Sequence, residues 1–126
     1  IGKNWRTAEL MREVFDKFYQ PKADGLCGND DCGQMSAWYI FGALGFYPVN
    51  TVNCTYVIGA PQIPQATINL PMNKTFTMRA NNLSEKNKYV KSVQLNGQKL
   101  TEPHITHEQI MQGGTLIFEM TDTPIK

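Results

Sequence analysis

GLCGNDDCGQMSAWYIFGALGFY, residues 25–47, is the stretch that decides the predicted fold. Its acidic, glycine-rich part, residues 28–33, runs directly into a segment that is apolar on nearly every side. A helix of that composition is expected to be buried, and this one is too short to span a membrane. The sequence therefore places two carboxylates, Asp30 and Asp31, at the N-terminal mouth of a buried helix. Charge is costly there unless it caps the helix, binds a ligand or takes part in catalysis.

The central helix is predicted over residues 32–44. Asp31, followed three positions later by Gln34, matches a capping box with Asp31 at the N-cap. Gly45 stands where a left-handed C-terminal cap is expected, and Pro48 prevents continuation. Start and stop signals therefore agree with the apolar run.

An amphipathic helix is predicted before it, over residues 4–19. Its apolar face is formed by residues three and four positions apart: Leu10, Met11, Val14 and Phe18. Asn4 or Thr7 is expected to cap its start. Two ion pairs one turn apart are predicted on the solvent side: Arg12 with Asp16, and Glu13 with Lys17.

After Pro48 the pattern alternates, which is typical of strands. Strands are predicted at residues 55–58, 66–70, 74–79, 89–95 and 98–100, and around residues 116–120. A helical turn is expected over residues 106–112, where Thr106 and Gln109 repeat the capping-box spacing. Short strands at this spacing indicate an antiparallel sandwich. The fold class is thus α+β, two helices followed by an antiparallel β-sandwich-like segment of about six strands.

Composition restricts the functional classes. The 126 residues carry 12 basic and 11 acidic side chains, for a net charge of +1, and 41% are apolar. This describes about one ordinary domain and gives no support to nucleic-acid binding or a membrane span. Cys27, Cys32 and Cys54 lack zinc-ligand spacing, and buried thiols are expected. His104 and His107, three apart, are expected at the surface or hydrogen-bonded rather than as a metal pair.

At GLCGNDDCGQMSAWYIFGALGFYPV the sequence resembles glycoside hydrolase family 92, the calcium-dependent exo-acting α-mannosidases. The family hallmark is a Gly, an Asn or Asp, an acidic residue, an Asp, a variable residue and a Gly, leading into a helix of the type MSAWYVxSALGFYPV. Here the hallmark occupies residues 28–33. Similar flanking segments are WRT at residues 5–7 and YVIGAP at residues 56–61.

The resemblance implies a C-terminal piece of a larger enzyme. Residues 1–48 would be the last helices of an (α/α)6 toroid, including the acidic turn at residues 28–33, and residues 49–126 a β-rich domain that closes the chain. The general acid, a Glu, and the calcium ligands are expected upstream in the remainder of the parent polypeptide, with no metal ligand in this chain. A periplasmic, cell-surface or secreted location is implied as well.

An inverting glycosidase needs two carboxyl groups roughly 6.5–9.5 Å apart. Asp30 and Asp31 are sequence neighbours, so they do not form one such pair, and the turn is expected to supply the base side only. By resemblance Asp31 matches the main candidate for the base, and Asp30 is a second catalytic candidate or a sugar ligand. Asn29 stands where many relatives carry a second Asp, and its amide would orient water or a sugar hydroxyl. Gln34 is assigned to substrate binding as well.

Two alternatives stay open at this point. From spacing alone, Asp31 is an N-cap rather than a catalyst. The second alternative is that the chain is a carbohydrate-binding or structural β-module without catalysis. The central aromatic candidates for contacting a sugar in such a module are Tyr56, Phe76 and Tyr89. Trp38 and Tyr39 are expected in the core rather than on a sugar. If toroid helices are missing, the apolar helix faces are exposed and the isolated chain is expected to self-associate.

Overall fold

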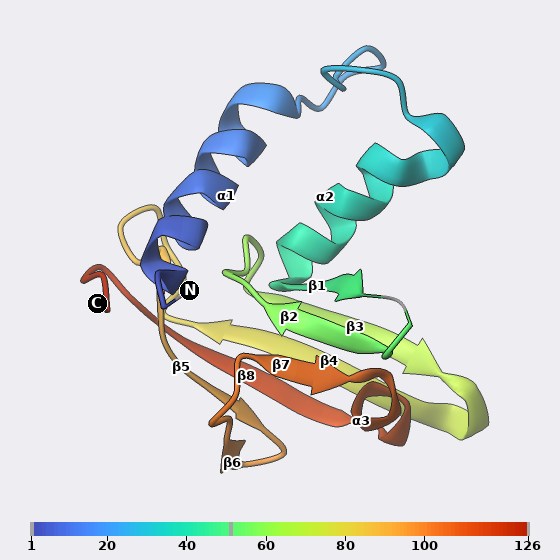
Figure 1. Cartoon of the computed structure of the whole chain (residues 1–126), viewed down its shortest axis with the longest axis vertical. Helices are drawn as coiled ribbons and strands as arrows, with labels where there is room; N and C mark the ends of the chain where they lie inside the picture. The colour runs from blue at the N-terminus through green and yellow to red at the C-terminus, as the bar shows by residue number, and fades with distance from the viewer. Residues whose placement is uncertain (1, 51, 126) are drawn as a thin grey trace.

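Two helices stand on two β-sheets in the computed structural model, which describes residues 2–50 and 52–125 (Figure 1). The first helix, α1, spans Asn4–Phe18 and agrees with the prediction to one residue. Its N-cap is Lys3, which makes no side-chain cap hydrogen bond, so the predicted caps were wrong. The Lys17–Glu13 ion pair forms, with 2.7 Å between Nζ and Oε1. The second pair on this helix joins Arg6 to Glu9 instead of Arg12 to Asp16.

The second helix, α2, spans Gln34–Leu44. Its C-terminal end matches the sequence signal, because Gly45 has a left-handed φ of 84° and donates its N–H to the carbonyl groups of Phe41 and Gly42. Its start does not match. The N-cap is Gly33, which has no side chain to offer, so the predicted capping box of Asp31 and Gln34 was wrong.

Within the described residues, the β half contains eight strands in two sheets, which share one hydrophobic core. The three-stranded sheet has the order β1-β2-β7, formed by β1 (Phe46–Asn50), β2 (Thr55–Ile58) and β7 (His104–Thr106). The five-stranded sheet has the order β3-β4-β8-β5-β6, formed by β3 (Gln65–Leu70), β4 (Lys74–Asn81), β5 (Tyr89–Leu95), β6 (Gln98–Lys99) and β8 (Gly114–Thr121). Strands β1 and β7 were not predicted.

The α+β class is confirmed, but the five-stranded sheet is mixed. Strand β8 pairs with β5 in antiparallel fashion and with β4 in parallel, from Phe76 opposite Gly114 to Asn81 opposite Glu119. The expectation of purely antiparallel pairing was therefore wrong at this one pair. A parallel neighbour comes from a distant part of the chain, and alternation within a strand does not reveal its direction.

A short helix, α3 (His107–Gln112), precedes β8 and confirms its predicted cap. The Thr106 hydroxyl accepts a hydrogen bond from the Gln109 N–H at 3.1 Å, and the Gln109 side-chain oxygen accepts one from the Thr106 N–H at 2.8 Å. This reciprocal pair satisfies two backbone donors that would otherwise be left unbonded.

The core lies between the sheets and the C-terminal end of α2. Phe76, Leu116 and Phe118 from the five-stranded sheet and Ile105 from the other sheet are completely inaccessible to solvent. Phe46, the first residue of β1, is 2% exposed. Burial of such side chains supplies about 1.5–3 kcal/mol each.

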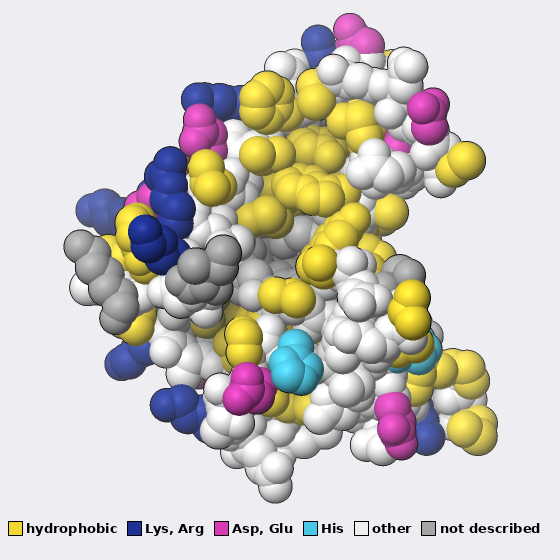
Figure 2. All heavy atoms as spheres, in the orientation of Figure 1, with side chains coloured by type: hydrophobic (Ala, Val, Ile, Leu, Met, Phe, Trp, Pro, Cys, Tyr) yellow, Lys and Arg dark blue, Asp and Glu magenta, His cyan; other side chains and the backbone are white. Residues whose placement is uncertain are grey.

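The two helices are covered on one side only. Ala8 of α1 is buried in a small cluster with Ala60 and Tyr89, and α2 buries only its last residues. Ile40 is 57% exposed, which contradicts the expectation that the central helix is buried all round. Figure 2 shows apolar side chains gathered over the upper part of the molecule, where these helices lie. No helix among the described residues is long and apolar enough to cross a membrane.

Candidate active site

The acidic segment forms a tight turn directly before α2. Residues Asp31–Gly33 have the hydrogen-bond spacing of a single 3₁₀ turn. Their backbone is not helical, however, because Cys32 (φ 56°, ψ 23°) and Gly33 (φ 76°, ψ 18°) both have left-handed dihedral angles. Together with the hydrogen bond from the Gln34 N–H to the Asp31 carbonyl oxygen, these angles describe a type I′ turn. A second bond joins the Gly33 N–H to the Asp30 carbonyl oxygen at 3.0 Å. Asp31 therefore occupies the first position of a well-defined turn.

Asp30 caps the start of α2 from outside this turn. Its Oδ1 accepts hydrogen bonds from the Met35 N–H at 2.8 Å and the Ser36 N–H at 3.0 Å, and its Oδ2 accepts one from the Ser36 hydroxyl at 2.6 Å. These bonds, the one from the Ser36 hydroxyl first, hold the pKa of Asp30 below its ordinary value although the residue is exposed. The capping role that the sequence assigned to Asp31 thus belongs to Asp30.

Tyr19 fixes the other side of the same helical turn. Its hydroxyl donates to the Met35 carbonyl oxygen at 3.1 Å, and its ring stacks on Trp38 with 5.7 Å between centroids and an interplanar angle of 9°. Burial raises the pKa of the Tyr19 hydroxyl. A backbone bridge to Leu26 closes the intervening loop at its base. The first turn of α2 is therefore held both through its N–H groups and through a carbonyl group.

The Asp31 carboxylate is exposed, and no hydrogen bond or ion pair to it is formed within the described part of the chain. Asn29 and Gln34, the other predicted site residues, are exposed in the same segment. The structure therefore presents Asn29, Asp30, Asp31 and Gln34 on one short surface segment, with Asp30 already occupied by its own hydrogen bonds. Sequence reasoning missed Ser36, because a Ser in the first helical turn gives no indication of which acid it bonds.

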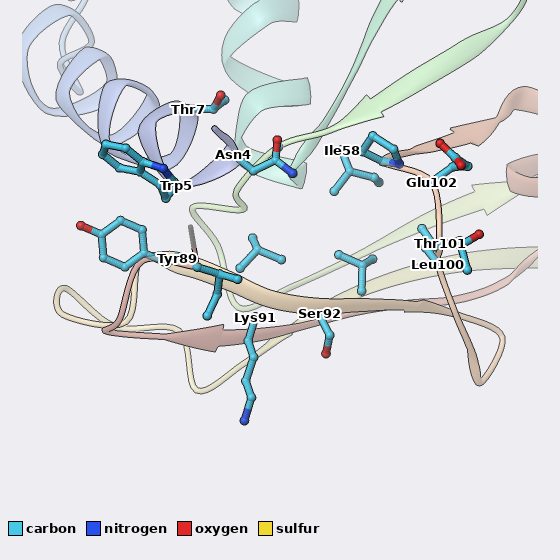
Figure 3. Close-up of a pocket in the computed structure, with 15 residues that line it drawn as sticks. Asn4, Trp5, Thr7, Ile58, Tyr89, Lys91, Ser92, Leu100, Thr101 and Glu102 are labelled. Atoms are coloured by element: carbon cyan, nitrogen blue, oxygen red, sulfur yellow. The ribbon is translucent and has the colours of Figure 1, made fainter. Parts of the chain in front are cut away.

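Two pockets bear on ligand binding. Ser36 lines a pocket of about 510 Å³ together with Tyr19, Leu26, Tyr39 and Ile40, so an apolar hollow lies beside the acidic turn. A second pocket, of about 300 Å³, lies between the start of α1, strand β5 and the segment before β7 (Figure 3). Asn4, Trp5, Tyr89 and Glu102 line it, and none of the acidic-turn residues does.

The aromatic residues beside the turn form a cluster. Phe15 of α1 stacks on Tyr39 with 4.6 Å between ring centroids and lies 5.6 Å from the ring of Trp38. Trp38 is half-buried in these contacts, whereas Tyr39 is 42% exposed. The cluster joins α1 to α2, and so supports the helix that follows the acidic turn.

The chain's other candidate ligands do not gather into a metal site. Calcium takes six to eight oxygen ligands, yet the described residues contain no group of three or more His, Cys, Asp or Glu side chains able to hold a metal. The residues present therefore do not fit a calcium site by themselves. His104 and His107 lie at the surface as expected, and His107 Nδ1 is 3.2 Å from the Tyr56 hydroxyl.

The cysteine prediction was wrong. Cys27, Cys32 and Cys54 are all exposed rather than buried. Two of them, Cys32 and Cys54, have left-handed φ angles of 56° and 52°. They lie in surface turns, which places their side chains outside the core.

Comparison of the chain with known proteins identifies its family. A model of the glycosyl hydrolase family 92 catalytic domain matches residues 1–122. A secreted glycosidase of Arthroderma benhamiae, described as uncharacterized, is 37% identical over 118 residues, covering 91% of this chain and 15% of that protein.

Two solved structures from Bacteroides thetaiotaomicron are also similar. One is a family GH92 alpha-mannosidase in complex with mannoimidazole, with 41% identity and a TM-score of 0.89 over 97% of this chain and 16% of that chain. The other is a family GH92 inverting mannosidase, with 40% identity and a TM-score of 0.89 over 98% of this chain and 17% of that chain. The chain thus spans between 15% and 17% of the length of these relatives.

Proposed function

The chain belongs to glycosyl hydrolase family 92, and from this premise we propose that its parent polypeptide is an inverting, exo-acting mannosidase that removes terminal α-linked mannose from glycans. The resemblance seen at residues 25–49 is confirmed by the family match over residues 1–122. Support for the activity comes from two similar proteins, which are named an alpha-mannosidase and an inverting mannosidase.

The observation that carries the proposal is the Asp31 carboxylate. It is exposed and takes no hydrogen bond from the described residues, while the turn that bears it is fixed on both sides. A general base needs a free lone pair that can accept a proton from water, and it must be held at a fixed position within hydrogen-bond reach of that water. In an inverting reaction Asp31 takes a proton from the attacking water, while an acid from the remainder of the polypeptide protonates the departing oxygen.

Asn29 and Gln34 are proposed as substrate contacts. Both are exposed next to Asp31 and carry amides, which donate and accept hydrogen bonds to sugar hydroxyls or to the attacking water. A catalytic or sugar-binding role for Asp30 stays a prediction, and the three hydrogen bonds that its carboxylate accepts count against it.

The larger frame is also part of the proposal. Residues 1–48 would complete a helical toroid, whose other helices cover the exposed side of α2, and residues 49–126 would form the closing β-rich domain. Calcium dependence, with ligands from the remainder of the parent, is proposed from the family alone. A location outside the cytoplasm, periplasmic, cell-surface or secreted, is proposed because a similar protein is described as secreted.

A carbohydrate-binding module is the less favoured function. Such a module needs aromatic rings at the surface of the β half. Phe76 is 0% exposed and Tyr89 is 8% exposed, so two of the three aromatic candidates are in the core. Tyr56 packs edge-on against Phe46, with 5.7 Å between their ring centroids. These positions leave little aromatic surface for a sugar.

The test is the Asp31→Asn substitution in the full-length parent, assayed on α-linked mannobioses in calcium. We expect activity to fall by about a thousandfold or more with an unchanged thermal melt, since Asp31 makes no bond that Asn would lose. Asp24→Asn is the control, because Asp24 is an exposed acid of the preceding loop whose Oδ1 forms a surface ion pair with Lys22 Nζ at 3.4 Å. Near-normal activity of Asp31→Asn would refute the assignment of the base.

A further inference from the structure

We propose that Asp30 is a positioning residue, which holds the turn that carries Asp31, and not a group that contacts sugar or water. This inference rests on the proposed function, because it defines how the proposed base is held. It assigns different roles to two neighbouring acids that the sequence does not distinguish.

The first argument is that both oxygens of the Asp30 carboxylate already hold the start of α2. Both of its oxygens accept hydrogen bonds, two from backbone N–H groups and one from the Ser36 hydroxyl, at 2.6 to 3.0 Å. Three of the roughly four acceptor sites of this carboxylate are therefore used, and turning it toward a sugar would release backbone N–H groups at the start of α2 that helical bonding leaves without partners. The lowered pKa of Asp30 also makes it a weak proton acceptor.

The second argument is that the turn needs an external tie. The backbone of Cys32 is left-handed, a conformation that residues with a Cβ rarely adopt without support from their surroundings. The bonds of Asp30 reach five and six residues along the chain, to Met35 and Ser36, and so close a loop around Asp31 and the strained turn. With that loop closed, the backbone of Asp31 is held in place relative to α2 and is not part of a free surface segment.

The third argument concerns Ser36. Its hydroxyl makes the shortest of the three bonds, 2.6 Å to Oδ2, and no other hydrogen bond to this hydroxyl occurs among the described residues. The same side chain lines the apolar pocket next to the turn. Ser36 is therefore a second positioning residue, acting through Asp30.

The experiment compares Asp30→Asn with Asp30→Ala in the full-length parent. Asn keeps an oxygen that accepts from both N–H groups, and its amide can donate to the Ser36 oxygen, so the geometry survives while the charge is lost. We expect Asn to keep kcat within about tenfold of the native value and Ala to lose about a hundredfold or more, with KM changed less than kcat. The acid limb of the pH–rate profile should persist in Asp30→Asn, because it belongs to Asp31.

A loss in Asp30→Asn as large as in Asp30→Ala, with both variants folded, would overturn the proposal and make Asp30 chemically active. Loss of the acid limb in Asp30→Asn would do the same. Ser36→Ala is expected to lower kcat about three- to tenfold with little change in KM. The control is Ser84→Ala, which removes the hydroxyl of another exposed serine with one local hydrogen bond. That hydroxyl accepts from the Asn87 N–H at 3.0 Å, in the loop between β4 and β5.

Hydrogen exchange separates this proposal from the proposed function. The N–H groups of Met35 and Ser36 should exchange at least about tenfold faster in Asp30→Ala than in the native parent or in Asp30→Asn. If exchange is faster in Asp30→Ala but Asp31→Asn is still active, Asp31 is not the base. The role of Asp30 in positioning that base is then refuted as well. If Asp31→Asn is inactive but exchange is the same in all Asp30 variants, the proposed function stands and the positioning role is refuted.

Discussion

Replacing Gly45 by Ala tests how α2 is joined to the sheets. Gly45 has a φ of +84°, and a Cβ there would lie 2.9 Å from the Pro61 nitrogen and 3.0 Å from Phe118 Cζ. The left-handed conformation costs a residue with a Cβ about 1–2 kcal/mol. Forcing an atom into a packed core costs about 1–3 kcal/mol more. We therefore expect Gly45→Ala to lower the free energy of unfolding by about 2–5 kcal/mol, a large fraction of a domain's typical stability.

The matched control is Gly97→Ala in the hairpin between β5 and β6. Gly97 has nearly the same φ, +81°, but an added Cβ would meet nothing within 4 Å. Only the conformational cost of about 1–2 kcal/mol is expected there. Urea unfolding of both variants, followed by circular dichroism and tryptophan fluorescence, gives the difference directly. If the two variants agree within about 0.5 kcal/mol, the crowding argument at Gly45 is refuted.

Two further predictions concern the helices. The isolated chain should self-associate in light scattering through its exposed helix faces, and the double variant Tyr39→Ser/Ile40→Ser should not. Val52→Ser, at an exposed residue outside the helices, should leave association unchanged, and a clean native monomer would contradict the prediction. Bonds from Arg6, and then from the Tyr89 hydroxyl, lower the pKa of Glu9 below its ordinary value of 4.5. The stabilisation is thus present above about pH 4.5 and is lost as pH falls through the folded-state pKa. Glu9→Gln should therefore lower the melting temperature at pH 7 and by progressively less as the pH falls below about 4.5, and a drop that does not shrink with pH would contradict the argument.

The sequence predicted the termini of most elements but not how the acidic turn is built. Gly45 and the Thr106 capping box follow from strong local preferences, and both were confirmed. The start of α2 was misplaced because Cys32 is left-handed, a conformation that Cys seldom adopts and that no local pattern indicates. The shift moved the cap from Asp31 to Asp30, since only Asp30 then reaches the N–H groups of Met35 and Ser36.

The missed strands and the parallel pair have a different cause. Pro48 follows the end of α2, as predicted, but it also lies inside β1, an edge strand, where a missing N–H is tolerated. Strand β7 is only three residues long and is recognised by its pairing with β2 rather than by its own sequence. The pairing of β4 with β8 depends on contacts between residues 76–81 and 114–119, which no local window contains.

The central place of β8 has a consequence for biosynthesis. Strands β3 and β4 pair as one hairpin and β5 and β6 as another, and β8 lies between the two hairpins. While the ribosome has translated only as far as β6, each hairpin leaves an edge open, and an isolated two-stranded unit is marginally stable. The sheet can close only after residues 114–121 have emerged. Until then both open edges can pair with other chains, so a nascent or prematurely terminated product is the species that most needs a chaperone.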